Sequence, residues 1–400
     1  MPGSLPDRRP TEIARVLLAG AILLLVVHTL GRFIYTPLLP YLVDDGLLTP
    51  QSGAAIATWN YLGYLLGALL AVRWHRPDQI QRLLPWTLGL HVGTTLLQTQ
   101  VTDINALTVL RWLNGLANGA VFVQAPALIL EWLVLRRRAN LSGLVYLGVG
   151  TGLLLSSGLV TLSASVLTGP ARWWPAALLS IPLAWWAGRA LRALQVPARP
   201  QAADGSVLRR GSLFDRASTP LFLSYAGAGL GYILPMTFLP LMAKQQLPAQ
   251  AWLIDGAWLI VAALTLASAF IWNAIGSRFG DLAALRCNLV IQAFGVVAPV
   301  FLFGEAGIVL CASLIGCSWL GAVLLTQRIG RALHPHQGPR LSAALIAVYG
   351  LAQMSGPWLV EQWLERGGQL ESAFWISVGA LIWALGFAAM VPKQTTQTED

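Results

Sequence analysis

Charged residues are scarce in this sequence. Asp, Glu, Lys and Arg make up 11% of its 400 residues, whereas soluble globular proteins average about 25%. Apolar side chains make up 56%, and the mean hydropathy is +0.63. These values exclude the soluble, secreted, fibrous and disordered classes and indicate an integral membrane protein. Twelve crossing helices of about 20 residues would use about 240 residues, which leaves no room for a separate soluble catalytic domain.

Cysteine and lysine are also rare. The cysteines are odd in number and have no metal-ligand or C-x-x-C spacing, so we expect reduced core thiols and neither a metal nor a cofactor. They are Cys287, Cys311 and Cys317. Only two of the 26 basic residues are lysine, a bias that indicates a GC-rich genome and hence a bacterial inner membrane. The net charge of +9 does not indicate nucleic-acid binding, because membrane proteins hold Lys and Arg in cytoplasmic loops.

Long apolar runs predict the fold. The basic N-terminal segment is followed by a run that continues to Pro40 without a small-residue cleavage site, so we interpret it as a retained first helix rather than a signal peptide. Eleven further runs follow, each close to the length of a membrane span. The twelve runs are 14–42, 51–73, 83–101, 105–135, 140–165, 173–194, 218–242, 251–275, 282–303, 306–327, 341–363 and 372–391. We predict an all-α integral membrane protein with twelve transmembrane helices.

A long polar segment rich in Arg, Pro and Gly separates six of these runs from the other six, as a linker would. We predict two pseudo-symmetric six-helix halves with a cytoplasmic linker between them and a cytoplasmic tail. The predicted boundaries are 1–194 for the N-terminal half, 195–217 for the linker, 218–391 for the C-terminal half and 392–400 for the tail.

The two halves contain a sequence repeat. GRFIYTPLLP from Gly31 and GYILPMTFLP from Gly231 share their first Gly and their final Leu-Pro, at an offset of 200 residues. Transporters use such duplications to build a binding site at the interface of the repeats. If the N-terminus is inside, 21 of the 26 basic residues fall on the inner side of the membrane and three on the outer side. The positive-inside rule then predicts that both termini are cytoplasmic.

Two arginines, Arg32 and Arg111, fall within the predicted spans. A charge at the centre of a spanning helix costs roughly 2.5–3.5 kcal/mol on insertion scales, so it indicates function by default. Polar companions at helical spacing form two stripes. The stripes are His28, Arg32 and Tyr35 in the first run, and Arg111, Asn114 and Asn118 in the fourth. We predict that both face one substrate-binding cavity, where guanidinium groups suit a carboxylate or phosphate; alternatively, both arginines bond helix carbonyls or reach the outer interface.

Candidates for proton coupling are few. Asp255 lies about a turn into the eighth run, Glu131 lies near the cytoplasmic end of the fourth, and His28 could titrate near neutral pH. Each has a structural alternative, because the helix dipole favours an acid at a helix start and a buried histidine is often a neutral core residue. Asn60 and Tyr64 in the second run are interpreted as packing residues.

These features resemble the major facilitator superfamily and, within it, the YbfB-like bacterial branch. The resemblance is carried by the twelve spans, the midpoint linker, the run RWLNGLANGA with Gly115 and Gly119, and the segments GRFIYTPLLP and NYLGYLLGA. It implies alternating access, with the first, fourth, seventh and tenth helices around a central cavity. The gating loop signature of that superfamily, D-R-x-G-R, is degenerate here. The second half has SRFGD with Arg278 and Gly280, and only Arg76 is comparable in the first half.

We therefore expect a secondary active transporter rather than an enzyme, carrying a small organic anion. The sequence has no ATP-binding Gly-rich loop with Lys and Ser or Thr, so we expect a proton gradient to supply the energy. The alternative is an exporter of amphipathic or cationic compounds, which would need Asp255 or Glu131 in the cavity. An enzyme would need a convergent His, Asp or Glu cluster, and a channel would need repeated polar rings. The expected partners are a small-molecule substrate and the lipid bilayer, with no nucleic acid, and the chain is expected to be a monomer.

Overall fold

The computed structural model describes residues 10–74, 76–196, 212–334 and 338–392, and all regular structure in these ranges is helical. Most of the predicted linker 195–217 and of the tail 392–400 lies outside the described residues. The elements are α1 (Pro10–Leu24), η1 (Leu25–Phe33), α2 (Tyr35–Asp44), α3 (Pro50–Arg73), α4 (Pro77–Leu97), α5 (Ile104–Val134), η2 (Ala139–Tyr146), α6 (Leu147–Ser163), η3 (Gly169–Trp173), α7 (Trp174–Arg192), α8 (Thr219–Gln246), α9 (Leu253–Phe279), α10 (Asp281–Phe301), α11 (Glu305–Leu333), α12 (Gly338–Glu365) and α13 (Leu370–Met390).

Nine helices in the described part of the chain are long and apolar enough to cross a membrane. They are Thr11–Asp44, which joins α1, η1 and α2, and Leu141–Ser163, which joins most of η2 to α6, together with α3, α5, α8, α9, α10, α11 and α13. The helices α4, α7 and α12 contain 21, 19 and 28 residues but fall outside this set. The prediction of an all-helical membrane protein is confirmed, whereas the number of twelve crossings stays a prediction.

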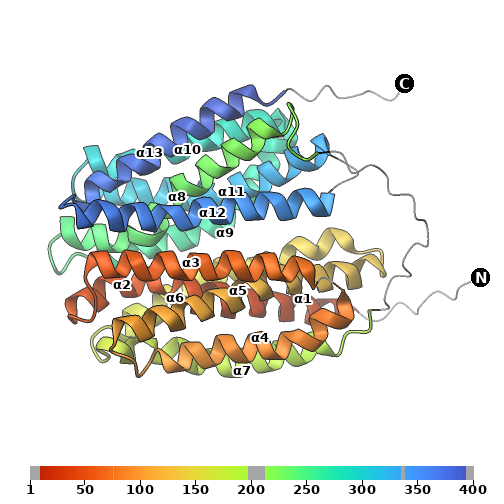
Figure 1. Ribbon diagram of the computed structural model, residues 1–400, viewed down its shortest axis with the longest axis horizontal. Coiled ribbons are helices and arrows are strands. Elements are labelled where there is room, and N and C mark those ends of the chain that lie inside the picture. The colour runs from red at the N-terminus through yellow and green to blue at the C-terminus, as the bar shows by residue number, and fades with distance from the viewer. Residues whose placement is uncertain (1–9, 75, 197–211, 335–337, 393–400) are drawn as a thin grey trace, which may run out of the picture.

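The helices gather in two groups (Figure 1). Helices α1 to α7 lie together below in this view, and α8 to α13 lie together above; we name these the first and second groups. Contacts between the groups are made chiefly by α3 with α12, α6 with α9 and α2 with α8. Among the nine candidate spans, α8 is the most enclosed, with 89% of its most apolar stretch buried inside the protein. Helix α8 therefore lies inside the molecule, with α11, α12 and α13 of its own group and α2 of the first group around it.

Glycine faces bring α3 and α5 into direct backbone contact. A Cβ atom added to Gly115 or Gly119 would lie 2.1 or 2.0 Å from the carbonyl oxygen of Asn60 or Tyr64. In return, a Cβ atom added to Gly63 would lie 2.1 Å from the carbonyl oxygen of Trp112. Since only glycine permits this separation, the Gly-rich run of α5 fixes the position of α3 and of the tyrosines that α3 carries.

The first membrane-spanning helix changes its winding in the middle. Residues Leu25–Phe33 form a π-helix, and the amide of Ile34 donates to the carbonyl oxygen of Thr29 at 2.8 Å. The cause lies just downstream, because Pro37 has no N–H and its ring crowds the carbonyl group of Phe33 four residues earlier. Wide turns of this kind are rare and frequently lie at functional sites. Arg32 lies in this segment and contacts Gln353 of α12 in the second group.

Candidate functional site

Arg32 lies at the junction of the two groups and is 2% exposed. Its Nη2 donates to Oε1 of Gln353 in α12 at 3.3 Å. Its guanidinium carbon lies 4.1 Å from the ring centre of Tyr64 and 4.4 Å from that of Tyr61, both in α3. Cations over aromatic faces are stabilised by about 0.5–2 kcal/mol. A positive charge from η1 is thus held between ring faces of the first group and an amide of the second.

Aromatic rings of the second group continue from Gln353. The Nε2 of Gln353 donates to the hydroxyl of Tyr232. The ring of Tyr232 lies nearly parallel to Trp319, with centroids 5.5 Å apart and an interplanar angle of 2°, and to Tyr349 at 5.5 Å and 13°. Tyr349 in turn stacks on Tyr225 at 4.2 Å. These four buried rings, Tyr225, Tyr349, Tyr232 and Trp319, are named the aromatic ladder.

Arg111 has a different environment, although it is equally buried. Its Nη1 donates to the carbonyl oxygen of Gly31 at 2.5 Å, and its Nη2 donates to that of Arg32 at 3.1 Å. The guanidinium also lies over the ring of Tyr35, 4.8 Å from its centre, and the Tyr35 hydroxyl donates to the carbonyl oxygen of Gly53 at 2.9 Å. Arg111 and Tyr35 therefore fasten η1 and the start of α2 to α5 and α3.

Neither arginine has an acidic partner in the part of the chain that the structure describes. Within the described ranges, no ion pair includes Arg32 or Arg111. The Nε atom of each is buried without a hydrogen-bond partner. Desolvating a charge costs several kcal/mol unless opposite charge compensates, so this part of the protein carries uncompensated positive charge. Chemically, the arrangement can attract and hold an anion.

His28 and Asn118 lie beside this site. Nδ1 of His28 is 3.4 Å from Oδ1 of Asn118, and the imidazole stacks on Phe122 with ring centroids 4.3 Å apart. Its ring centre is 5.9 Å from that of Tyr64, which also contacts Arg32. Nδ2 of Asn118 is buried without a hydrogen-bond partner. His28 and Arg32 of the predicted stripe therefore lie beside the same ring of Tyr64, and Asn118 lies beside His28, whereas Tyr35 lies with Arg111.

Asn114, predicted for the same cavity, is directed elsewhere. Its Nδ2 lies within hydrogen-bonding distance of Oγ1 of Thr94 at 3.2 Å and Oγ1 of Thr95 at 3.0 Å, both in α4. Asn60, interpreted as a packing residue, donates from Nδ2 to the carbonyl oxygen of Arg111 at 2.7 Å. These two amides connect α5 to its neighbours rather than to Arg32.

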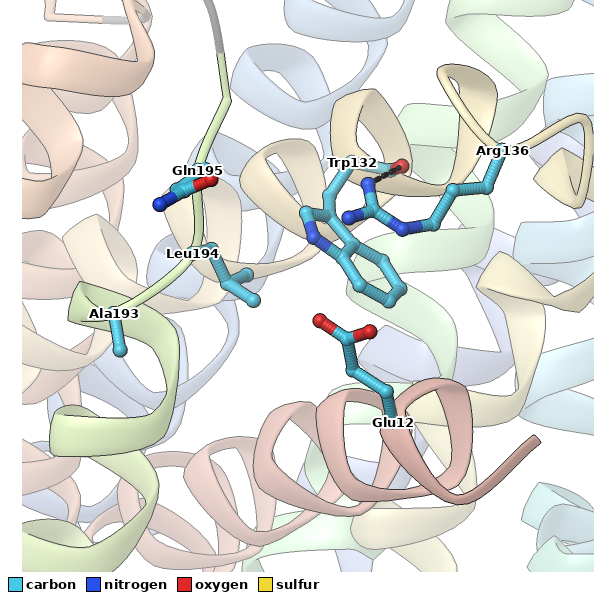
Figure 2. A pocket seen from close by; sticks show the side chains of 6 residues that line it. All are labelled: Glu12, Trp132, Arg136, Ala193, Leu194 and Gln195. Atoms are coloured by element: carbon cyan, nitrogen blue, oxygen red, sulfur yellow. Dashed lines mark hydrogen bonds between the residues drawn. The ribbon is translucent and has the colours of Figure 1, made fainter. Parts of the chain in front are cut away.

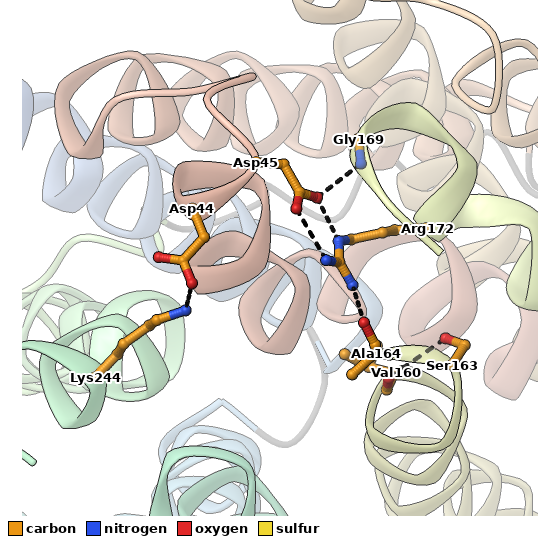
Figure 3. A network of polar contacts seen from close by, with 8 residues as sticks. All are labelled: Asp44, Asp45, Val160, Ser163, Ala164, Gly169, Arg172 and Lys244. Atoms are coloured by element: carbon orange, nitrogen blue, oxygen red, sulfur yellow. Dashed lines mark hydrogen bonds and ion pairs between the residues drawn. The ribbon is translucent and has the colours of Figure 1, made fainter. Parts of the chain in front are cut away.

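Two polar networks meet at one end of the bundle, which we name the far end (Figure 3). Arg172 of η3 holds the carboxylate of Asp45 with two hydrogen bonds, of 2.5 and 3.0 Å, and also donates to the carbonyl oxygen of Ala164 at 3.1 Å. The Arg172 guanidinium holds the pKa of Asp45 below its usual value. This network lies within the first group. The second is the ion pair of Lys244 in α8 with Asp44 in α2, which joins the two groups.

The acidic proton-coupling candidates are not beside Arg32. The hydroxyl of Tyr41 in α2 donates to Oδ1 of Asp255 in α9 at 2.6 Å, a second polar bridge between the groups at the far end. Glu131 lies at the opposite end of α5, next to Trp132, which lines a small cavity described below. Neither acid forms an ion pair within the described ranges.

The residues predicted as a gating loop lie in two separate turns. Arg76 pairs with Asp78 at 3.2 Å, and both side chains are about half exposed. Gly280 joins α9 to α10 with φ of 89°, a conformation that favours glycine. Arg278 beside it lies over the ring of Phe279 at 5.4 Å. The firm contact of this turn is instead Asp281 with Arg328 of α11, at 3.0 Å.

A small cavity of about 90 Å³ lies where α1, α5 and α7 approach one another (Figure 2). Arg136 stacks over the indole of Trp132 at 3.7 Å and donates to its carbonyl oxygen at 3.2 Å. Glu12 points toward this pair from α1, and the segment 193–195 closes another side. None of the residues around Arg32 lines this cavity, so it is separate from the candidate site.

Sequence reasoning missed the second group's share of the site. Gln353, Tyr232, Tyr349 and Trp319 are neutral, and aromatic residues in membrane helices are too common to single out. One signal was present. In the repeat that starts at Gly31 and Gly231, Tyr232 occupies the place of Arg32, so the repeat itself indicated where the second group would face the charge.

Comparisons with known proteins agree with this architecture. Residues 24–389 match a family model described as uncharacterised MFS-type transporter YbfB. No curated protein sequence matches the chain.

Solved structures of transporters are similar to this chain. The nucleoside transporter NupG is similar with a TM-score of 0.71 and 15% identity, covering 96% of this chain and 100% of that one. A point mutant of NupG is similar with a TM-score of 0.70 and 16% identity, covering 94% of this chain and 100% of that one. An auto-inhibited peptide transporter of the POT family is similar with a TM-score of 0.72 and 11% identity, covering 98% of this chain and 99% of that one. At such low identities the likeness shows the fold alone.

Proposed function

Because the chain belongs to the MFS-type transporter family described by the name YbfB, we propose that it carries a small organic anion across a bacterial inner membrane by alternating access. It is a multi-pass membrane protein of a transporter family, not an enzyme. The observation that carries the proposal is Arg32, which lies between the two groups with no acidic partner among the described residues.

The position and charge of Arg32 support an anionic substrate. A buried cation without a counter-ion is destabilising, and a membrane protein retains such groups chiefly where they act on a ligand or ion. Arg32 contacts α3 in the first group and α12 in the second. An anion bound there would contact both groups at once, as alternating access requires.

We assign the two arginines different tasks. Both terminal nitrogens of Arg111 already donate to carbonyl oxygens of η1, so Arg111 holds the segment that carries Arg32. Tyr35 shares this holding task. Arg32, Asn118 and the rings around them then form the substrate-binding surface, while Asn114 supports α4.

The transport cycle that we propose uses the two groups as the moving halves. Helices α4, α7 and α12 then cross the membrane with the nine candidate spans, which makes twelve crossings with both termini in the cytoplasm. The halves correspond to residues 1–194 and 218–391. The contacts of Thr36 with Met236 and of Asp44 with Lys244 join positions exactly one repeat offset, 200 residues, apart, as expected for equivalent helices that face each other across a two-fold axis.

We assign proton coupling to Asp255. Its carboxylate accepts a hydrogen bond from Tyr41 across the two groups, and protonation would weaken that charge-assisted bond. Proton binding from outside would then favour opening at the far end. His28 is the second candidate, because it lies beside the same ring of Tyr64 as Arg32.

Export of a cationic or amphipathic compound is the rival function. It would require Asp255 or Glu131 in the substrate site, whereas Asp255 binds Tyr41 and neither acid pairs with Arg32. The aromatic ladder would suit a cation, but the guanidinium beside it would repel one. The charge of the site therefore favours the anion.

The test uses thermal unfolding of the purified protein with panels of organic anions, cations and neutral solutes. A ligand at about 100 times its Kd stabilises the folded state by about 2.7 kcal/mol. We expect anions alone to stabilise the wild type, and Arg32→Gln to abolish that shift. The control is Arg189→Gln, which removes another arginine that lies over an aromatic ring, Trp185, at an exposed position. Stabilisation by cations that survives in Arg32→Gln would overturn the proposal.

A second test addresses proton coupling in proteoliposomes. We expect Asp255→Asn to retain exchange of the substrate between the two sides but to lose accumulation driven by a pH gradient. Accumulation that persists in Asp255→Asn and fails in His28→Gln would move the coupling role to His28.

A further inference from the structure

Resting on the anion transport proposed above, we propose that the substrate is a flat aromatic monocarboxylate. Its carboxylate binds Arg32, and its ring lies against the aromatic ladder. The inference follows from the charges available at the site and from the orientation of the rings that surround it.

The site offers one positive charge to a ligand. Both Nη atoms of Arg111 are bound to backbone carbonyl oxygens, whereas Nη2 of Arg32 donates a hydrogen bond of 3.3 Å to a neutral amide. Nε of Arg32 is buried with no hydrogen-bond partner. A guanidinium with donors to spare can hold one carboxylate in a two-pronged manner. A dicarboxylate would leave its second charge without a partner.

The site also lacks a counter-charge for an amino group. No carboxylate within the described ranges pairs with Arg32, and Asp255 is bound to Tyr41. The buried cation would repel an ammonium group. These two features disfavour amino acids and other zwitterions.

Aromatic rings lie on both sides of Arg32. On one side, Tyr61 and Tyr64 lie with their faces toward the guanidinium. On the other, Tyr232 and Trp319 are parallel within 2°, and Tyr349 continues the same orientation within 13° of Tyr232. Phe33 bridges the sides, 6.4 Å from the Trp319 centroid. When the groups separate, a flat ring can stack on the ladder while its carboxylate stays on Arg32, a geometry that aromatic pairs favour over contact with a puckered aliphatic ring.

Gln353, at the polar edge of the aromatic ladder, limits how far the carboxylate of the ligand can lie from its ring. Gln353 contacts both Arg32 and the Tyr232 hydroxyl, so it lies where the carboxylate of a bound ligand would meet the ring face. A second carboxylate oxygen can accept from the Gln353 amide once that amide releases Tyr232. The pattern thus matches a carboxylate attached directly, or through a short link, to a ring.

The experiment compares matched ligands by calorimetric binding to the purified protein. Benzoate and indole-3-acetate are the aromatic monocarboxylates, and cyclohexanecarboxylate is the aliphatic match of benzoate. Phthalate adds a second negative charge, phenylalanine adds an ammonium group, and benzyl alcohol removes the charge. We expect benzoate, indole-3-acetate or both to bind, and the aromatic monocarboxylate that binds more tightly to have an affinity at least ten-fold higher than that of cyclohexanecarboxylate. We expect no measurable binding of the last three ligands.

Ring variants test the location. Tyr232→Leu and Trp319→Leu should reduce the preference for the aromatic ring to less than three-fold, while Tyr232→Phe keeps the ring and retains the preference even if the leucine variants fold poorly. Trp185→Leu is the control, because that indole is 63% exposed and lies outside the site.

The outcomes separate this inference from the proposed function. Binding can depend on Arg32 while cyclohexanecarboxylate, phthalate or phenylalanine binds as tightly as benzoate and indole-3-acetate, or more tightly. That result would overturn the inference of an aromatic monocarboxylate but leave the proposal of anion transport intact. Binding of neither aromatic monocarboxylate would also overturn the inference. If no organic anion of the wider panel binds, or if binding is unchanged in Arg32→Gln, the proposed function itself is wrong.

Discussion

Arg32 and Arg111 carry the same charge but have different partners. Arg111 donates to the carbonyl oxygens of Gly31 and Arg32, and each buried carbonyl that loses its donor costs about 1–3 kcal/mol. Arg32 lies over tyrosine rings and donates to Gln353, but it has no acidic partner among the described residues. One arginine therefore supports the fold, and the other is held by it.

This difference predicts opposite effects of two matched substitutions. We expect Arg111→Gln to lower the melting temperature of the unliganded protein, because two buried carbonyls lose their donors. We expect Arg32→Gln to leave that temperature unchanged or to raise it, because a buried charge without a counter-ion is removed. Thermal unfolding in detergent measures both. A large loss of stability in Arg32→Gln with little effect of Arg111→Gln would contradict the assignment.

Asp45 gives a prediction for the dependence of stability on pH. The pKa of its carboxyl is lowered in the folded protein, first of all by the hydrogen bonds from Arg172. A lowered pKa means that the contribution to stability is complete above the unfolded pKa, about 3.9, and is lost as pH falls toward the folded pKa. We therefore expect Asp45→Asn to be less stable than the wild type at pH 7, with the difference narrowing below about pH 4.

Melting temperatures measured between pH 3 and pH 7 check this prediction. Asp78→Asn is the control, because Asp78 pairs with Arg76 where both side chains are about half exposed, and such pairs contribute little. A gap between Asp45→Asn and the wild type that stays constant with pH would show that the carboxyl has no lowered pKa.

At the scale of the helix, the contact of α3 with α5 depends on the absence of side chains. An alanine at Gly115 would bring its Cβ atom 2.1 Å from the carbonyl oxygen of Asn60, so the helices must move apart. Overpacking of this kind costs about 1–3 kcal/mol. The movement would also strain the hydrogen bond from Asn60 to the carbonyl oxygen of Arg111.

We therefore expect Gly115→Ala to lower the melting temperature and to weaken anion binding, since α3 carries Tyr61 and Tyr64. Gly93→Ala in α4 is the matched control, because a Cβ atom there meets nothing within 4 Å. Binding calorimetry and thermal unfolding of the two variants test the effect. Equal behaviour of the two alanines would mean that the close approach is not needed.

How far the sequence predicts these elements depends on the kind of signal. Charge in an apolar run is conspicuous, so Arg32 and Arg111 were found directly. Helical spacing puts Asn114 on the same face of the helix as Arg111. That face is broad enough that the two side chains contact different helices, Arg111 contacting η1 and Asn114 contacting Thr94 of α4. The π-helix of η1 escaped prediction, because hydrophobic periodicity does not resolve a single wide turn.

Predictions that join distant segments needed the structure. Nothing in one sequence connects Gln353 to Arg32, which lie 321 residues apart. The offset of 200 residues between the repeats was visible, and the contacts of Thr36 with Met236 and of Asp44 with Lys244 follow it. The repeat thus indicated which helices face each other, whereas it could not indicate which side chains meet.

At the scale of the whole molecule, two bridges that start from α2 hold the far end closed, beside an exposed hydrogen bond of 3.2 Å from Gln51 of α3 to Glu365 of α12. Lys244 pairs with Asp44, whose side chain is 53% exposed, and exposed pairs contribute about 0–1 kcal/mol. Tyr41 donates to the Asp255 carboxylate at 2.6 Å in a partly buried place, and a hydrogen bond to a charged group contributes about 1.5–3 kcal/mol. The second bridge should therefore dominate.

Removing the Tyr41 bridge should shift the protein toward opening at the far end. Since 1.4 kcal/mol is a factor of ten in an equilibrium constant, we expect Tyr41→Phe to increase the open population about ten-fold or more, and Asp44→Asn to increase it by less than about five-fold. The probe is a cysteine at Thr36, which is 3% exposed and contacts Met236 across the groups, in a chain whose three native cysteines are replaced by alanine.

The rate of reaction with a membrane-impermeant maleimide, added outside intact cells, measures this opening. Asp45→Asn is the control, because it breaks the network with Arg172 inside the first group and leaves both bridges in place. If Asp45→Asn accelerates labelling as much as Tyr41→Phe does, general loosening of the far end explains the effect. If Tyr41→Phe and Asp255→Asn both accelerate labelling and Asp45→Asn does not, the Tyr41–Asp255 bond holds the far end closed, and protonation of Asp255 would open it.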